Sequence, residues 1–169
     1  MTASISGSAV RVGRILPIFY LPSVHGGKSG PAATRSKYNL VLTFLPNVQE
    51  AATYLQGIAQ VYAEILRNDA RVIAVLGADL DTTQRVAEAL ELPFALLADE
   101  DGATAARILG GGNRAGLIAT DRYGVVYCME ATVRIEELPA PSVIPDWLEY
   151  VEMQCPECTD GADKRWSVE

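Results

Sequence analysis

Residues 38–45 read YNLVLTFL and are followed directly by Pro46 and Asn47. A run rich in leucine, β-branched and aromatic side chains is typical of a strand buried on both faces, and Pro46 ends such a strand. Residues 49–67 then carry apolar side chains three and four positions apart, which places them on one face of a helix. This stretch therefore predicts a buried strand that leads into an amphipathic helix.

Strands and helices alternate along the rest of the chain. Further strands are expected at residues 71–76, 94–97, 117–120 and 125–129, and further helices at residues 81–91, 103–109 and 144–154. Asp81 is expected to cap the first of these helices, because Gln84 stands three residues later, as in a capping box. Residues 121–124 (DRYG) predict a tight turn between the last two strands.

The N-terminal part has weaker signals. An apolar run at residues 14–21 predicts a strand or hairpin arm, and residues 22–36, rich in Gly, Ser and Pro, predict a loop. Together, the alternation predicts one α/β domain with a mixed central sheet and helices on both faces.

The bulk composition restricts the partners. The chain has 169 residues and a net charge of −7, so its surface repels phosphate groups, and we expect neither nucleic acid nor a membrane surface as a partner. No segment has the roughly 18 continuous apolar residues of a membrane span, and the first residues do not resemble a secretory signal. Three cysteines are too few for a disulfide scaffold. We therefore expect a cytoplasmic protein.

Several short segments, taken in order, are similar to one known family. They are residues 12–13 with 16–19 (VG, LPIF), 40–46 (LVLTFLP), 73–76 (IAVL), 92–94 with 97–99 (LPF, LAD) and 116–124 (GLIATDRYG). Their order and spacing resemble the peroxiredoxin branch (alkyl hydroperoxide reductase and thiol-specific antioxidant) of the thioredoxin superfamily. The resemblance implies a thioredoxin-like fold over residues 1–154, with residues 155–169 as a C-terminal tail.

The resemblance also implies a degenerate catalytic site. The family signature is a proline, a threonine four residues later and the peroxidatic cysteine three residues after that. Pro46 matches, but Glu50 stands at the threonine position and Thr53 at the cysteine position. Because peroxide cleavage needs a thiolate, ordinary peroxidase activity is not expected. Arg114 is the candidate for the arginine that the family places before its late strand.

The tail carries a C-x-x-C pair, Cys155 and Cys158. Three interpretations stay open: a redox pair, half of a zinc site, or neither role. A complete zinc site needs two more ligands, and only Cys128 and His25 remain in the chain. Cys128 lies in an apolar strand and is expected to be an inert core thiol, and His25 is expected to be a solvated loop residue.

Two functions follow from these expectations. The first is a redox protein that lacks the usual peroxidatic cysteine and is active in thiol–disulfide chemistry through Cys155 and Cys158, with a thiol reductant as its partner. The second is a non-catalytic binding or assembly module that keeps the thioredoxin fold and binds a protein, including a second copy of itself. No cofactor or bound metal is expected for either.

Overall fold

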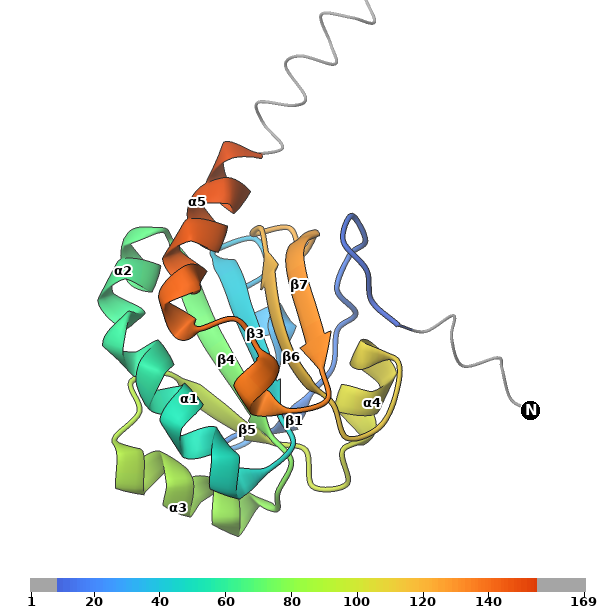
Figure 1. The fold of residues 1–169 in the computed structure, drawn as a ribbon, viewed down its shortest axis with the longest axis vertical. Helices are drawn as coiled ribbons and strands as arrows, with labels where there is room; N and C mark the ends of the chain where they lie inside the picture. Colours follow the sequence, from blue (N-terminus) through green and yellow to red (C-terminus); the bar gives the residue numbers. More distant parts are fainter. Residues whose placement is uncertain (1–8, 155–169) are drawn as a thin grey trace, which may run out of the picture.

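A computed structural model describes residues 9–154, which form one mixed sheet covered by helices (Figure 1). The strand order is β5-β4-β3-β6-β7. In chain order these strands are β3 (Asn39–Leu45), β4 (Ala70–Leu76), β5 (Ala95–Ala98), β6 (Ala115–Thr120) and β7 (Val126–Thr132). The central strand β3 is parallel to β4 and antiparallel to β6, so the sheet is mixed, which confirms the α/β expectation.

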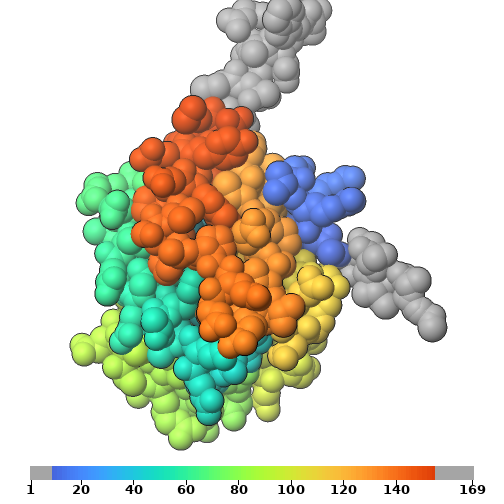
Figure 2. Space-filling view, in the orientation of Figure 1, coloured from blue at the N-terminus to red at the C-terminus, as the bar shows by residue number. Residues whose placement is uncertain are grey.

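Helices lie on both faces of this sheet. One face is covered by α1 (Val48–Gln60), α2 (Tyr62–Arg67), α3 (Leu80–Leu90) and α5 (Ile144–Met153). The other face is covered by α4 (Ala103–Leu109) and by the segment that precedes β3. Figure 2 shows the first face, where the orange segment that follows β7 lies against α1, drawn in teal.

Every residue of β3 is buried, as its composition predicts. Val41 and Leu45 pack under α1 and α5, whereas Leu40, Leu42 and Phe44 pack under α4, because successive strand residues face opposite sides. Thr43 satisfies its buried hydroxyl by donating a hydrogen bond to the carbonyl oxygen of Gly116 at 2.8 Å. The two faces of β3 therefore contribute side chains to two apolar cores, one on each side of the sheet.

The structure corrects two helix predictions. Residues 49–67 do not form one helix: the chain breaks at Val61 into α1 and α2. The cap of α3 is Asp79 and not Asp81, because the backbone is still extended at Asp79 and its carboxylate accepts the N–H of Thr82 at 2.8 Å. Asp81 lies inside the first turn of α3 instead.

The N-terminal segment is less regular than expected. Instead of a continuous strand at residues 14–21, it forms a single bridge between Ile15 and Val125 and then the short strand β1 (Leu21–Pro22). Pro17 contributes to this, since it has no N–H group for a ladder. The expected loop contains β2 (Lys28–Ser29), which pairs with β1, and a 3₁₀ turn, η2 (Pro31–Ala33).

The turn between β6 and β7 forms as expected. One carboxylate oxygen of Asp121 accepts the N–H groups of Tyr123 and Val125, and Gly124 has a φ of +90°. After β7 the chain passes through two 3₁₀ turns, η3 (Ile135–Glu137) and η4 (Pro141–Val143), before α5. These two turns bring the chain back to α1.

Candidate functional site

The carboxyl end of β3 carries three of the four positions that the resemblance singled out. Asn47 is extended, and its side-chain oxygen accepts the N–H of Gln49 at 2.9 Å, so α1 begins at Val48. Glu50 lies in the first turn, where a carboxylate complements the positive end of the helix dipole. Thr53 lies one turn further on and is exposed. The helix start thus presents a carboxylate and a hydroxyl to solvent.

Arg114 and Pro46 line one hollow of about 330 Å³, which we call the Arg114 hollow. It lies beside the N-terminal end of α4, and its wall includes Asp99. The carboxylate of Asp99 accepts the N–H groups of Thr104 at 3.3 Å and Ala105 at 2.9 Å. Asp99 therefore holds the start of α4, and the exposed charges that line this hollow are Arg114 and the carboxylates of Glu100 and Asp101.

Glu50 and Thr53 line a different hollow, the α1 groove, which has a volume of about 650 Å³. It runs along α1 toward Pro141 of η4. The structure thus brings Pro46 to Arg114 and Glu50 to Thr53. In the part of the chain that the structure describes, Thr53 and Arg114 do not line a common hollow.

A third hollow, of about 510 Å³, contains an arginine that the sequence did not indicate. Pro46, Glu50 and Arg134 are among the residues that line it, and we call it the Arg134 hollow. Arg134 enters from the loop after β7, so tertiary folding brings it beside the first turn of α1. The spacing of Arg134 and Glu137 suits a short helical turn, but no local signal shows that this turn lies against α1.

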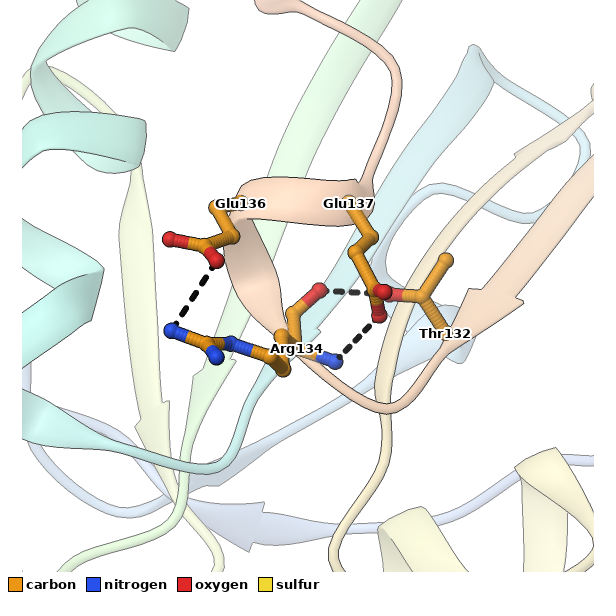
Figure 3. Close-up of polar contacts among 4 residues, drawn as sticks. All are labelled: Thr132, Arg134, Glu136 and Glu137. Carbon is orange, nitrogen blue, oxygen red and sulfur yellow. Dashed lines mark hydrogen bonds and ion pairs between the residues drawn. The ribbon is translucent and has the colours of Figure 1, made fainter.

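Three contacts hold the Arg134 loop, as Figure 3 shows. The hydroxyl of Thr132 donates to the carbonyl oxygen of Arg134 at 2.7 Å, and the N–H of Arg134 donates to the carboxylate of Glu137 at 3.0 Å. The guanidinium of Arg134 forms an ion pair with Glu136 at 2.9 Å, and both side chains are more than half exposed. The positive charge of Arg134 is therefore partly neutralised within its own loop.

Cys128 is the one cysteine within residues 9–154, and it lies away from these hollows, in β7. Its thiol is partly buried, so it is more accessible than the core thiol that the sequence indicated. Burial raises the pKa of Cys128, which leaves the thiol protonated at neutral pH. The start of α1 therefore has no thiolate from the described residues.

His25 lies at the other edge of the sheet. It is exposed in the turn between β1 and β2, and this hairpin is joined to β5 by the bridge between Ser23 and Leu97. Since β5 and β7 are opposite edges, four strand spacings or about 19 Å apart, His25 and Cys128 cannot ligate one metal ion. Residues 9–154 contain no cluster of three or more metal-ligating side chains. The expected pair Cys155 and Cys158 lies outside the described residues.

Comparisons with known proteins agree on one family and one fold. The sequence profile of the AhpC/TSA family matches residues 12–127. No curated protein matches the sequence. Within residues 9–154, no helix is both long and apolar enough to cross a lipid bilayer.

Three solved structures illustrate the likeness of fold. AhpC of Enterococcus faecalis is 16% identical with a TM-score of 0.72, over 84% of this chain and 92% of that chain. A reduced 2-Cys peroxiredoxin of Plasmodium vivax is 13% identical with a TM-score of 0.70, over 85% and 97%. Peroxidoxin BcpB of Mycobacterium tuberculosis is 17% identical with a TM-score of 0.67, over 83% and 94%. At these identities the likeness establishes a shared thioredoxin-like fold.

Proposed function

Since the chain belongs to the AhpC/TSA family of peroxiredoxin-like proteins, we propose that it is a thiol–disulfide redox protein that acts through Cys155 and Cys158. The observation that carries this proposal is the side chain at the start of α1, where Thr53 is exposed and no thiol of residues 9–154 is nearby. A family member that has no nucleophilic thiol at the start of α1 can carry out thiol chemistry only through cysteines at other positions. Burial raises the pKa of Cys128 in β7, so the C-x-x-C pair is the other source of thiols in the chain.

The proposed reaction is a two-electron exchange. The thiols of Cys155 and Cys158 lose two protons and two electrons and form one disulfide. The electrons go to a hydroperoxide, which becomes an alcohol and water, or to a substrate disulfide, which becomes two thiols. A thiol reductant then restores the pair. We propose the cytoplasm as the compartment, because it keeps such thiols reduced between turnovers.

The test uses the full chain with Cys128→Ser, in which Cys155 and Cys158 are the remaining thiols. After treatment with a stoichiometric hydroperoxide, a thiol reagent is expected to find both thiols lost, and both regained after reduction. Peroxide or disulfide consumption with a thiol reductant is expected to stop in Cys155→Ser and in Cys158→Ser. If the thiols of Cys128→Ser stay free under oxidation, the proposal fails.

A second function is favoured by the α1 groove. An open groove of about 650 Å³ beside a helix without a nucleophile suits a binding or assembly module. Such a module would bind its partner with all three cysteines replaced by serine, and its partners would include a second copy of the chain. Redox turnover that depends on the C-x-x-C pair would exclude a purely non-catalytic role.

A further inference from the structure

The Arg114 hollow lies at the carboxyl ends of the parallel strands β3, β4 and β5. The apolar part of its lining includes Phe44 of β3, Val75 of β4, and Ala105 and Ala106 of α4. The chain leaves β3 and β4 toward the helices on one face of the sheet, but it leaves β5 toward α4 on the other face. Connections that diverge in this way open a crevice, and open α/β sheets bind their ligands there.

The two ends of this hollow carry opposite charges. Glu100 and Asp101 follow β5, whereas Arg114 comes directly before β6. Both segments lie at the same end of the sheet, because β6 runs antiparallel to β3. Since β4 and β3 separate β5 from β6, the two segments are three strand spacings apart, or about 14 Å. The negative and positive groups therefore enter the hollow from opposite ends.

These charges do not neutralise each other. Glu100 and Arg114 are both exposed, and within residues 9–154 neither side chain forms an ion pair or a hydrogen bond. Asp101 uses one carboxylate oxygen to accept the N–H of Ala103 at 3.1 Å, which leaves its other oxygen for a further donor. The hollow thus offers one guanidinium and two carboxylates to groups of opposite charge.

The backbone at the start of α4 adds no donor to this set. Its first N–H groups are bound by the carboxylates of Asp99 and Asp101 and by the carbonyl oxygen of Gly102. A simple anion would therefore meet Arg114 as its one charged donor, with carboxylates nearby that repel it. A simple cation would leave Arg114 without a partner. A ligand that carries both signs of charge satisfies both ends of the hollow.

We propose that the Arg114 hollow binds a short zwitterion whose ammonium and carboxylate groups stand at opposite ends of an apolar chain. Such ligands include ω-amino acids and dipeptides of small apolar residues. The guanidinium of Arg114 donates to the ligand carboxylate, and the carboxylates of Glu100 and Asp101 accept from the ammonium. The volume of about 330 Å³ is within the range of small-molecule sites. The site involves no cysteine, so it stands apart from the proposed redox function.

The test is an NMR titration of the isotope-labelled full-length chain, reduced and at low ionic strength. The probe ε-aminocaproate is expected to shift the amide signals of Gly77, Gly102 and Gly112, which line the hollow. Caproate and hexylamine each lack one charged group, and norleucine, an isomer of ε-aminocaproate, has both charges at one end. Each of these three is expected to bind about fivefold more weakly, the effect of one exposed ion pair. Equal binding of any of them overturns the proposal.

Charge variants identify the two ends of the hollow. Arg114→Gln is expected to abolish the preference for ε-aminocaproate over hexylamine. Glu100→Gln combined with Asp101→Asn is expected to abolish the preference over caproate. Arg107→Gln is the matched control, because Arg107 is an exposed arginine of α4 that does not line the hollow, and it should keep both preferences. A preference retained in the Arg114 variant, or lost in the control, contradicts the proposed contacts.

A parallel titration with alanylalanine distinguishes the two kinds of ligand. This dipeptide carries the same two charged groups on a peptide backbone. Tighter binding of alanylalanine than of ε-aminocaproate assigns the hollow to dipeptides, and weaker binding assigns it to ω-amino acids. If neither compound shifts the three glycine signals, the hollow is not a zwitterion site.

Discussion

The hydroxyl of Tyr54 donates a hydrogen bond of 2.7 Å to the carbonyl oxygen of Pro139. Tyr54 comes from α1 and is 7% exposed, and Pro139 comes from the segment between β7 and α5. The bond therefore joins α1 to the segment after β7, and both of these elements line the α1 groove.

Replacing Tyr54 by phenylalanine tests this bond. Tyr54→Phe keeps the ring in the core but leaves the Pro139 carbonyl without this donor, and we expect a loss of about 1 kcal/mol in the free energy of unfolding. Urea denaturation followed by circular dichroism measures it. Tyr62→Phe is the matched control, because the Tyr62 ring packs on Phe94 with centroids 5.5 Å apart. An equal loss in both variants would show that the Tyr54 bond has no particular role.

Tyr54 also predicts a dependence of stability on alkaline pH. Burial raises the pKa of Tyr54 above its usual value. In the unfolded chain Tyr54 ionises near pH 10, so above that pH unfolding releases a proton that the folded state retains. Its contribution to stability is complete below about pH 10 and falls above it, by about 1.4 kcal/mol per pH unit. Urea titrations from pH 8 to 11 should show a shallower decline in Tyr54→Phe than in the wild type.

Gly57 should resist replacement by alanine despite its position in a helix. Alanine is favoured over glycine in a helix by about 1 kcal/mol, but a Cβ atom at Gly57 would lie 2.7 Å from Cγ of Pro141. We expect Gly57→Ala to lower stability by about 1 kcal/mol, because overpacking costs about 1 to 3 kcal/mol. In a Pro141→Ala background the same change should be neutral or stabilising. If Gly57→Ala stabilised the otherwise wild-type protein, the close approach of α1 and η4 would be contradicted.

A cysteine at position 53 reports the electrostatics of the α1 start. The positive end of the helix lowers the pKa of a thiol there, whereas the carboxylate of Glu50, three residues away on the same face, raises it. We expect Glu50→Thr to lower the pKa of the Thr53→Cys thiol by about 1 unit. Thiolate absorbance during a pH titration measures this, with Cys128 replaced by serine and the tail pair blocked.

Gln56→Cys is the control for that titration, because Gln56 is also exposed in the α1 groove but lies one turn further from Glu50. Glu50→Thr should move its pKa much less. Equal shifts at positions 53 and 56 would mean that Glu50 acts at long range, and the start of α1 would not be a distinct electrostatic site.

The capping of α3 gives a direct comparison between two aspartates. The backbone N–H of Thr82 holds the pKa of Asp79 below its usual value. Asp79 therefore supports the fold above pH 4, and this support is lost as the pH falls further and the carboxyl group is protonated. We expect Asp79→Ala to lower the melting temperature at pH 7 and Asp81→Ala to change it much less. The reverse order would restore Asp81 as the cap.

The strands were predictable because the residue types that favour each strand lie within the strand itself. Residues 38–45 and 71–76 are predominantly apolar runs, and both form strands within one residue of the expected bounds. The cap of α3 was not predictable in this way, since Asp79 and Asp81 are both acidic and only the onset of helical backbone separates them.

The site was harder to predict because its parts are distant in the sequence. Pro46, Glu50 and Thr53 follow one another in a helix start, so their positions followed from the strand before them. The position of Arg114 depends on how the glycine-rich turn after α4 packs, and that of Arg134 on how the chain returns from β7 to α1. The residues adjacent in sequence to Arg114 or to Arg134 therefore do not indicate where either side chain lies in the fold.

The central place of β3 has a consequence for synthesis on the ribosome. One edge of β3 can pair with β4 soon after both emerge, but the other edge waits for β6, whose Thr120 pairs with Leu40. At about 5 to 20 residues per second, β6 follows β3 only after several seconds. During that interval the nascent chain exposes an apolar strand with an open edge, the kind of surface that aggregates or recruits a chaperone.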